Sequence, residues 1–258
     1  PGWIDPTLPT DHLLAGWDAP ADKVVVLKDG AVAEQGAPEG TVLIAESQTA
    51  GKGRLGRHFT SPPGTGIYFS LLLRPRLKAA DSVFITVAAS VAVRRAIKLL
   101  LHADTQIKWV NDVYFHNKKL CGILTEASME IESGYLNYAV LGIGINIKPP
   151  ENGYPEEFAF KTTNLSEISH PLPDDLKNKL IAEVLTQFDR LYETLEQKDY
   201  IEEYKEASCI LGRKIEILTG PCAGPAVAED IDSDANLIVR LPNGNTAALN
   251  SGDVSICL

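Results

Sequence analysis

The sequence predicts an α+β protein with a mixed, largely antiparallel sheet covered by helices, and a small β-barrel at its C-terminal end. Three observations support this prediction. Several β-branched or apolar runs in the first 150 residues are typical of strands, and one helical stretch interrupts them. A long amphipathic helix follows. After residue 208 the chain changes to short strands joined by Gly, Asp and Asn turns, so we expect two domains, residues 1–207 and 208–258.

The first elements follow from short apolar runs. Residues 41–46 (TVLIAE) are β-branched and predict a buried strand, and residues 66–74 (GIYFSLLLR) predict the next one. Residues 82–101 carry apolar side chains at helical spacing, and Asp81 or Ser82 can serve as the N-cap. A glycine-rich loop therefore lies between two strands.

The middle of the chain predicts a hairpin and a further strand. Residues 113–115 and 120–126 are expected to pair around a turn with the sequence HNK. Residues 135–147 (YLNYAVLGIGINI) then form a strand that is antiparallel to its predecessor if the preceding ESG turn is tight. Residues 149–173 are rich in Pro, Glu and Asn, which favours a loop.

Two helices and a set of short strands complete the chain. Asp174 or Asp175 can cap a long helix whose apolar stripe runs from Leu176 to Leu195. A shorter helix is expected over residues 200–207. Beyond it, RKIEIL, GPAVAEDID, ANLIVRL and TAALN predict strands, and LPNGNT is a strong hairpin signal. These strands form the predicted barrel.

Composition excludes several classes of protein. No window holds the roughly 18 apolar residues that a membrane span needs. A formal net charge of -10 disfavours a general nucleic-acid binder, because phosphate affinity needs a broad cationic surface. The four cysteines are widely spaced, at Cys121, Cys209, Cys222 and Cys257. They form no CxxC pair or Cys/His cluster, which argues against a structural zinc site and favours a cytoplasmic protein with reduced thiols.

The glycine-rich loop concentrates positive charge on a flexible segment. Its core, GKGRLGR, places Lys52, Arg54 and Arg57 among three glycines. Glycine lets backbone N–H groups approach an anion closely, and arginine offers a planar fork to phosphate or carboxylate. The loop departs from the P-loop pattern, since Glu46 stands where the first Gly belongs and Gly53 where Ser or Thr belongs. We predict an anion-binding loop; a solvated basic loop and a nucleic-acid contact are the competing interpretations.

Three more motifs carry polar groups at strand ends. KWVND (residues 108–112) combines a cation, an aromatic ring, an amide and a carboxylate, KKLCGIL follows it, and GIGIN (residues 142–146) ends in an amide. Each motif alone has a purely structural interpretation: Trp109 can be core, and Lys118 and Lys119 can lie on a solvated hairpin tip. Glycines within strands, however, often mark the close approach of a ligand.

Together these motifs resemble those of the biotin protein ligases, also called biotin–[acetyl-CoA-carboxylase] ligases. The family's GRGRxGR is GKGRLGR here, its KWPND is KWVND, its RKxxGIL is KKLCGIL, and its GxGIN is GIGIN. The resemblance runs from about residue 36 to residue 147 and resumes over the last 50 residues, where GDVSI fits the family's small SH3-like domain. The implied fold is that of the class II synthetases and biotin ligases.

The resemblance implies an ATP-dependent reaction in two steps. The biotin carboxylate attacks the α-phosphate of ATP, giving biotinyl-5′-AMP and pyrophosphate, and a lysine of a biotin carboxyl carrier protein then attacks the mixed anhydride. Mg²⁺ is expected, bound mainly through phosphates. The basic loop would fold over the intermediate as a mobile lid and shield it from water.

The resemblance also assigns roles to individual residues. Arg54 and Lys119 are expected at the reacting centre, Lys119 as an electrostatic stabiliser rather than a nucleophile. Biotin is expected to contact these two residues together with Gln48, Gly51, Lys52, Gly53, Gly122 and Leu124. ATP is expected to contact Arg54 together with Arg57, Phe59, Lys108, Asn111, Asp112 and Asn146.

Three positions depart from the family pattern. Lys52 replaces an arginine, which keeps the charge and loses the bidentate fork, and Val110 replaces a proline. The family also has a Ser-Thr-Asn motif that binds the biotin ureido group, and that spacing falls here on residues 22–24 (DKV). A biotin- and ATP-binding pseudo-enzyme or regulatory protein is therefore a competing hypothesis.

Lipoate-type ligases are a second competing hypothesis. They share the fold and the adenylation chemistry, but their motifs differ from GKGRLGR and KWVND. Some members of the biotin ligase family carry an N-terminal DNA-binding domain; no helix-turn-helix pattern precedes residue 41, so we expect none in this chain and no nucleic-acid partner. We expect no membrane association, and a homodimer could form by pairing of sheet edges.

Overall fold

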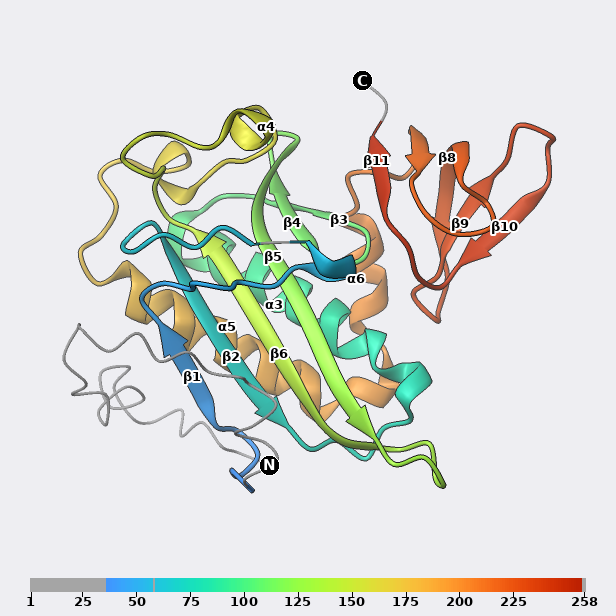
Figure 1. Ribbon diagram of the computed structural model, residues 1–258, viewed down its shortest axis with the longest axis horizontal. Helices are drawn as coiled ribbons and strands as arrows, with labels where there is room; N and C mark the ends of the chain where they lie inside the picture. Colours follow the sequence, from blue (N-terminus) through green and yellow to red (C-terminus); the bar gives the residue numbers. More distant parts are fainter. Residues whose placement is uncertain (1–35, 58, 257–258) are drawn as a thin grey trace.

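The computed structural model describes residues 36–57 and 59–256 and shows an α+β protein built on two antiparallel sheets (Figure 1). The predicted fold class is thus confirmed. The larger sheet has six strands in the order β1-β2-β6-β5-β4-β3. In chain order these strands are β1 (Val42–Ala45), β2 (Gly66–Leu73), β3 (Gln106–Lys108), β4 (Asp112–Phe115), β5 (Lys118–Met129) and β6 (Leu136–Asn146).

Helices cover one face of this sheet. The long helices α3 (Val83–Leu101) and α5 (Leu176–Glu193) lie behind the strands in Figure 1, and α6 (Tyr200–Glu206) lies beside β3. The sequence alternates accordingly, because successive strand residues point to opposite faces. In β6, Leu141, Ile143 and Ile145 are buried in the main hydrophobic core, whereas the intervening glycines face the other side. The opposite face of the sheet, which carries these glycines, is therefore the one available to bind a ligand.

The second sheet contains the C-terminal strands in the order β10-β9-β8-β7-β11. Its end strands β10 and β11 are not paired with each other in the described residues, so the predicted small barrel is not closed. The predicted division at residue 207 stays a prediction, and every strand of this sheet follows it. They are β7 (Lys214–Ile217), β8 (Gly224–Ile231), β9 (Leu237–Arg240), β10 (Thr246–Leu249) and β11 (Val254–Ile256).

Buried contacts join the C-terminal sheet to the rest of the molecule. The indole Nε1–H of Trp109 donates a hydrogen bond of 2.9 Å to the carbonyl of Ala235, between β8 and β9. Ion pairs of Lys198 with Asp234 (2.9 Å) and Lys205 with Asp230 (2.5 Å) add to this junction. One continuous hydrophobic core includes residues of both sheets.

The expected strands and long helices are confirmed, with local differences. The β4–β5 hairpin turns through only His116 and Asn117, both with positive φ, so Lys118 already belongs to β5. Leu195 lies after α5, in the short 3-10 helix η4 (Leu195–Gln197). The predicted loop 149–173 contains the short helix α4 (Glu156–Ala159) and the 3-10 helix η3 (Leu165–Glu167).

Two sequence predictions concern the segment expected to bind the ureido group and the absence of a membrane span. The DKV spacing at residues 22–24 falls outside the described residues. Among those that are described, no helix has the length and apolar character needed to cross a membrane. The remaining 3-10 turns are η1 (Arg54–Gly56) and η2 (Ala79–Asp81).

Candidate active site

A cavity of about 630 Å³ lies on the face of the large sheet that the helices leave open. Strand register explains its floor, because residues that pair across neighbouring strands share a face. Tyr68 of β2 pairs with Gly144 of β6, which pairs with Gly122 of β5. The next row along consists of Ser70, Gly142 and Leu124. The floor therefore consists of two rows, each with glycine on the central strand β6.

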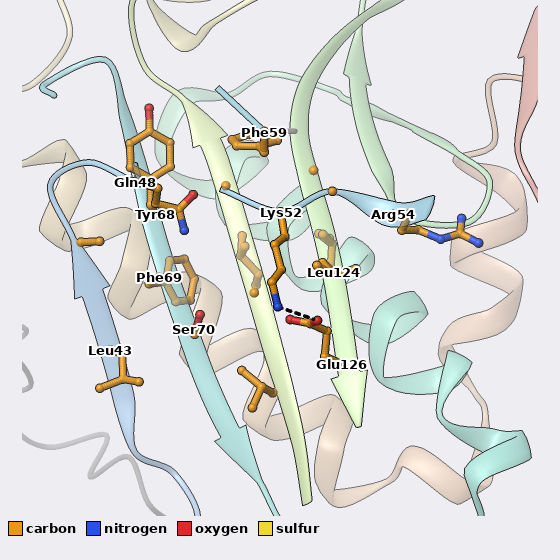
Figure 2. Close-up of a pocket in the computed structure, with 18 of the residues that line it drawn as sticks. Leu43, Gln48, Lys52, Arg54, Phe59, Tyr68, Phe69, Ser70, Leu124 and Glu126 are labelled. Atoms are coloured by element: carbon orange, nitrogen blue, oxygen red, sulfur yellow. Dashed lines mark hydrogen bonds and ion pairs between the residues drawn. The ribbon is translucent and has the colours of Figure 1, made fainter. Parts of the chain in front are cut away.

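The glycine-rich loop lies across this floor (Figure 2). Its base is closed by Gln48 and Ser61, since the Gln48 N–H donates to the Ser61 carbonyl (3.1 Å) and the Ser61 hydroxyl donates to Gln48 Oε1 (2.7 Å). The Phe59 N–H donates to the Gly51 carbonyl at 2.8 Å. These hydrogen bonds give the loop between β1 and β2 a defined conformation, although it contains few regular elements.

Phe59 lies directly on the glycines of the floor. A Cβ atom placed on Gly144 would lie 2.7 Å from Cε1 of the Phe59 ring, and one on Gly122 would lie 3.1 Å from Cε2. Both distances are closer than ordinary van der Waals contact. Gly144 of GIGIN and Gly122 of KKLCGIL are therefore required here, because an aromatic ring approaches the backbone at both positions.

The tip of the loop is a tight turn around η1. The Gly53 N–H donates to the Arg57 carbonyl (2.7 Å), and the Arg57 N–H donates to the Arg54 carbonyl (3.2 Å). Leu55 and Gly56 both have positive φ, which glycine adopts readily and leucine rarely does. This turn fixes the backbone that carries Arg54.

Each cation of the loop has a partner on a different part of the molecule. Lys52 extends across the cavity to Glu126 of β5 at 3.1 Å, as Figure 2 shows. A terminal guanidinium N–H of Arg54 donates to Asn111 Oδ1 at 3.1 Å. Arg57 forms an ion pair with Asp253 of the C-terminal sheet.

Two residues of the KWVND motif contact the side chains of Arg54 and Lys119. Asn111 uses both ends of its amide, accepting from Arg54 and donating to the Ile123 carbonyl (2.8 Å). The ammonium group of Lys119 lies 2.7 Å from a carboxylate oxygen of Asp112. The backbone of Lys119 is also held on its outer side, where its N–H donates to the Lys161 carbonyl at 2.7 Å.

Most of the sequence-predicted site residues come together at the cavity. Those that line it are Gln48, Lys52, Gly53, Arg54, Phe59, Asn111, Lys119, Gly122 and Leu124. Five other predicted residues do not line the cavity, and three of these contact a residue that does line it or the backbone beside it. Gly51 packs against Phe59 and Gln48, Asp112 pairs with Lys119, and Asn146 donates to the Thr163 carbonyl (3.0 Å) beside Lys119. The other two are Arg57 and Lys108.

Sequence reasoning missed several lining residues on strands. Tyr68 and Ser70 of β2 point into the cavity, and the period-2 alternation of GIYFSLLL places both on one face once that face is known. Burial raises the pKa of Tyr68, and its hydroxyl lies 3.0 Å from Thr65 Oγ1. The phenol therefore stays neutral at physiological pH. The others include Leu43, Tyr138 and Glu126.

Comparison with known proteins shows which family the chain is similar to. The sequence model of the biotin/lipoate A/B protein ligase family matches residues 24–146. The bifunctional ligase/repressor BirA of Bacillus subtilis is 37% identical over 161 residues, which cover 62% of this chain and 48% of that protein. The chain thus matches about half the length of this relative.

Two longer matches extend the comparison. The biotin–[acetyl-CoA-carboxylase] ligase of Mycobacterium tuberculosis is 30% identical over 223 residues, 84% of this chain and 79% of that protein. The structure of the biotin protein ligase from Aquifex aeolicus in complex with biotin and ATP superposes with a TM-score of 0.74 at 26% identity, covering 88% of this chain and 93% of that one. The chain belongs to the biotin/lipoate A/B protein ligase family.

Proposed function

We propose that this protein activates biotin with ATP to biotinyl-5′-AMP and transfers the biotin to a lysine of a biotin carboxyl carrier protein. The observation that carries the proposal is the division of the cavity: a glycine and hydrocarbon floor adjoins a polar cluster of Arg54, Asn111 and Lys119. A carboxylic acid with an apolar body fits that division, because its chain can lie on the floor while its carboxylate meets the cations.

In the first step two anions must meet. A biotin carboxylate oxygen attacks the α-phosphorus, a P–O bond forms, and the bond to the bridging oxygen of pyrophosphate breaks. Lys119 and Arg54 offset the repulsion between carboxylate and phosphate and stabilise the charge that grows on the phosphoryl oxygens. Asp112 orients Lys119 through their ion pair, and Asn111 orients Arg54 through their hydrogen bond.

In the second step the carrier lysine attacks the acyl carbon of the mixed anhydride as a neutral amine. A C–N bond forms, the C–O bond to AMP breaks, and the amine loses a proton to solvent. The loop and the Phe59 ring cover the floor and limit access of water to the anhydride. Gln48, Gly51, Lys52, Gly53, Gly122 and Leu124 would contact biotin in both steps.

The nucleotide would lie toward the polar cluster. We propose that Arg57, Lys108, Asn111, Asp112 and Asn146 serve ATP, either directly or through the backbone that they hold. No group of three or more His, Cys, Asp or Glu gathers as a metal site within the described ranges, and the nearby carboxylates of Asp112 and Glu126 are each paired with a lysine. These residues fit Mg²⁺ bound mainly through nucleotide phosphates, where it would supply further neutralising charge.

Other features of the proposal concern the setting of the protein. The carrier domain would present its lysine to the cavity, and a net charge of -10 does not steer an acidic partner toward it. A cytoplasmic location, a homodimer and the absence of nucleic-acid binding stay predictions from the sequence.

The test is biotin-dependent exchange of pyrophosphate into ATP. We expect exchange in the unaltered protein and a loss of about 10²–10³-fold in Arg54→Ala and in Lys119→Ala, the scale seen when a donor to developing charge is removed. Lys118→Ala is the matched control, because Lys118 neighbours Lys119 in sequence and does not line the cavity.

The outcomes distinguish the three hypotheses. Adenylation of biotin is supported if exchange requires biotin, is retained in Lys118→Ala and is lost in Arg54→Ala and Lys119→Ala. A folded protein that binds biotin and ATP without exchange would be a binding-only relative. Exchange stimulated by lipoate and not by biotin would move the protein to the other branch of the family.

A further inference from the structure

A side-chain contact joins the glycine-rich loop to the C-terminal sheet. Arg57 of the loop forms an ion pair with Asp253, which is 196 residues further along the chain. The Asp253 side chain is only 17% exposed, whereas that of Arg57 is 61% exposed. An ion pair in which the carboxylate is largely shielded from solvent is stronger than an ion pair between two fully exposed side chains.

Asp253 is held firmly on its own side of the contact. Its N–H donates to Thr219 Oγ1 (3.3 Å) and its carbonyl accepts from the Leu218 N–H (2.9 Å). It directly precedes β11, where Val254 pairs with Ile217 of β7. The C-terminal sheet is itself fixed to the KWVND motif by the buried hydrogen bond of Trp109. The carboxylate is therefore a fixed point relative to the cavity.

Arg57 lies at the end of the turn that carries Arg54. Its carbonyl accepts from Gly53 and its N–H donates to Arg54, so fixing Arg57 fixes the backbone of residues 53–57. Among the described residues, the side chain of Arg54 tethers this turn at a second point, through its hydrogen bond to Asn111. Asp253 therefore adds a contact to this turn on the side of the C-terminal sheet.

We propose that Asp253 is a positioning residue that anchors the glycine-rich loop to the C-terminal sheet and so holds Arg54 over the cavity. Only one of the guanidinium nitrogens of Arg57 is used by the carboxylate, so other donors can still meet an anionic ligand. The kinetic consequence rests on the proposed function, whereas the anchoring itself does not.

Limited proteolysis of the ligand-free protein tests the anchor directly. Leu55 at the loop tip is 62% exposed, and thermolysin cleaves on the N-terminal side of such residues. When opening is fast relative to cleavage, the cleavage rate follows the population of the open loop. Loss of one partly exposed ion pair should raise that rate about threefold to fivefold in Asp253→Asn. Cleavage before Ile131, 90% exposed on the β5–β6 hairpin, is the internal reference.

Asp234→Asn is the matched control. It also removes an aspartate of the C-terminal sheet that pairs with a cation across the junction, at Lys198, but it does not touch the loop. We expect its cleavage at Leu55 to match that of the unaltered protein. Equal acceleration in both variants would show a general loosening of the junction and would overturn the proposal, as would no acceleration in Asp253→Asn.

A double-mutant cycle with Arg57→Gln separates anchoring from unrelated effects. If the pair acts as a unit, Arg57→Gln and the double variant should cleave at Leu55 as fast as Asp253→Asn, and Asp253→Glu should restore protection. Additive acceleration would overturn the proposal. In pyrophosphate exchange, we expect the KM for ATP to rise about fivefold with kcat within about twofold in Asp253→Asn. An unchanged KM alongside faster cleavage would overturn the kinetic consequence alone.

Discussion

Substitution of Gly144 by alanine should separate ligand affinity from folding. The new methyl group would lie 2.7 Å from Cε1 and 2.8 Å from Cζ of Phe59, whereas ordinary contacts begin at 3.4 Å. The ring must therefore retreat by about 0.7 Å. Since Phe59 belongs to the loop, we expect the ring to swing off the floor while β6 keeps its position.

The magnitude follows from two opposing terms. Crowding of this kind costs about 1–3 kcal/mol. Replacing glycine by alanine at a position with ordinary φ returns about 0.4–1 kcal/mol through the unfolded chain. The free energy of unfolding should thus fall by no more than about 2.6 kcal/mol. The displaced ring would enter the space in which a ligand lies beside it, and a loss of about 1.4–2.8 kcal/mol in binding corresponds to about 10–100-fold in affinity.

The assay is calorimetric titration with biotin, alongside urea unfolding. Gly142→Ala is the matched control, because Gly142 lies two residues away on the same strand and lines the same cavity. A Cβ atom there would meet nothing closer than the Leu124 carbonyl oxygen at 3.5 Å. We expect that variant to bind biotin within about threefold of the unaltered protein.

Two results would refute the reasoning. Equal losses at Gly142 and Gly144 would mean that any methyl group on the floor blocks the ligand, whatever the position of Phe59. A loss at Gly144 that persists in full when Phe59→Ala is added would mean that the ring plays no part.

Other contacts predict the effect of two substitutions on stability and a difference in reactivity between two cysteines. Trp109→Phe leaves the buried Ala235 carbonyl unpaired and should lower the free energy of unfolding by about 1–3 kcal/mol in urea; an unchanged midpoint would contradict this. Glu126→Gln removes an exposed ion pair and should leave the melting temperature within about 1 °C, whereas a fall of several degrees in scanning fluorimetry would show a larger role. Burial raises the pKa of Cys209 to about 11, so at pH 8.5 about 0.3% of it is thiolate. Iodoacetamide should therefore label the half-buried Cys222 before Cys209, and equal labelling of the two by peptide mass mapping would count against this ordering.

The elements that the sequence predicted well are those with strong local patterns. Residues 66–74 and 135–147 alternate or run apolar for long enough to identify β2 and β6, and residues 82–101 have a clear helical period. The short elements β3 and α4 were missed, because three or four residues carry too little periodicity. The strand β11 was missed for the same reason: the segment GDVSI fits the family pattern, but its three strand residues are too few to predict a strand.

The candidate site was predictable where its residues lie in motifs. Asn111 directly precedes β4, and Lys119 and Gly122 lie on its antiparallel partner β5; the motifs alone pointed to these three residues. The partners of the loop were not predictable. Asp253 has no local feature that marks it for Arg57, because the contact depends on how the C-terminal sheet docks. Tertiary contacts of this kind leave no periodic trace in the sequence.

The alternation of glycine and isoleucine along β6 has a consequence for how this protein can vary. One set of residues packs against the helices and the intervening set forms the floor of the cavity. Insertion or deletion of a single residue within GIGIN would exchange the two sets downstream, filling the cavity with isoleucine and leaving holes beneath it. The length of this strand is therefore constrained as tightly as its glycines, and we expect a one-residue gap within GIGIN of a homologous chain to accompany a change of ligand.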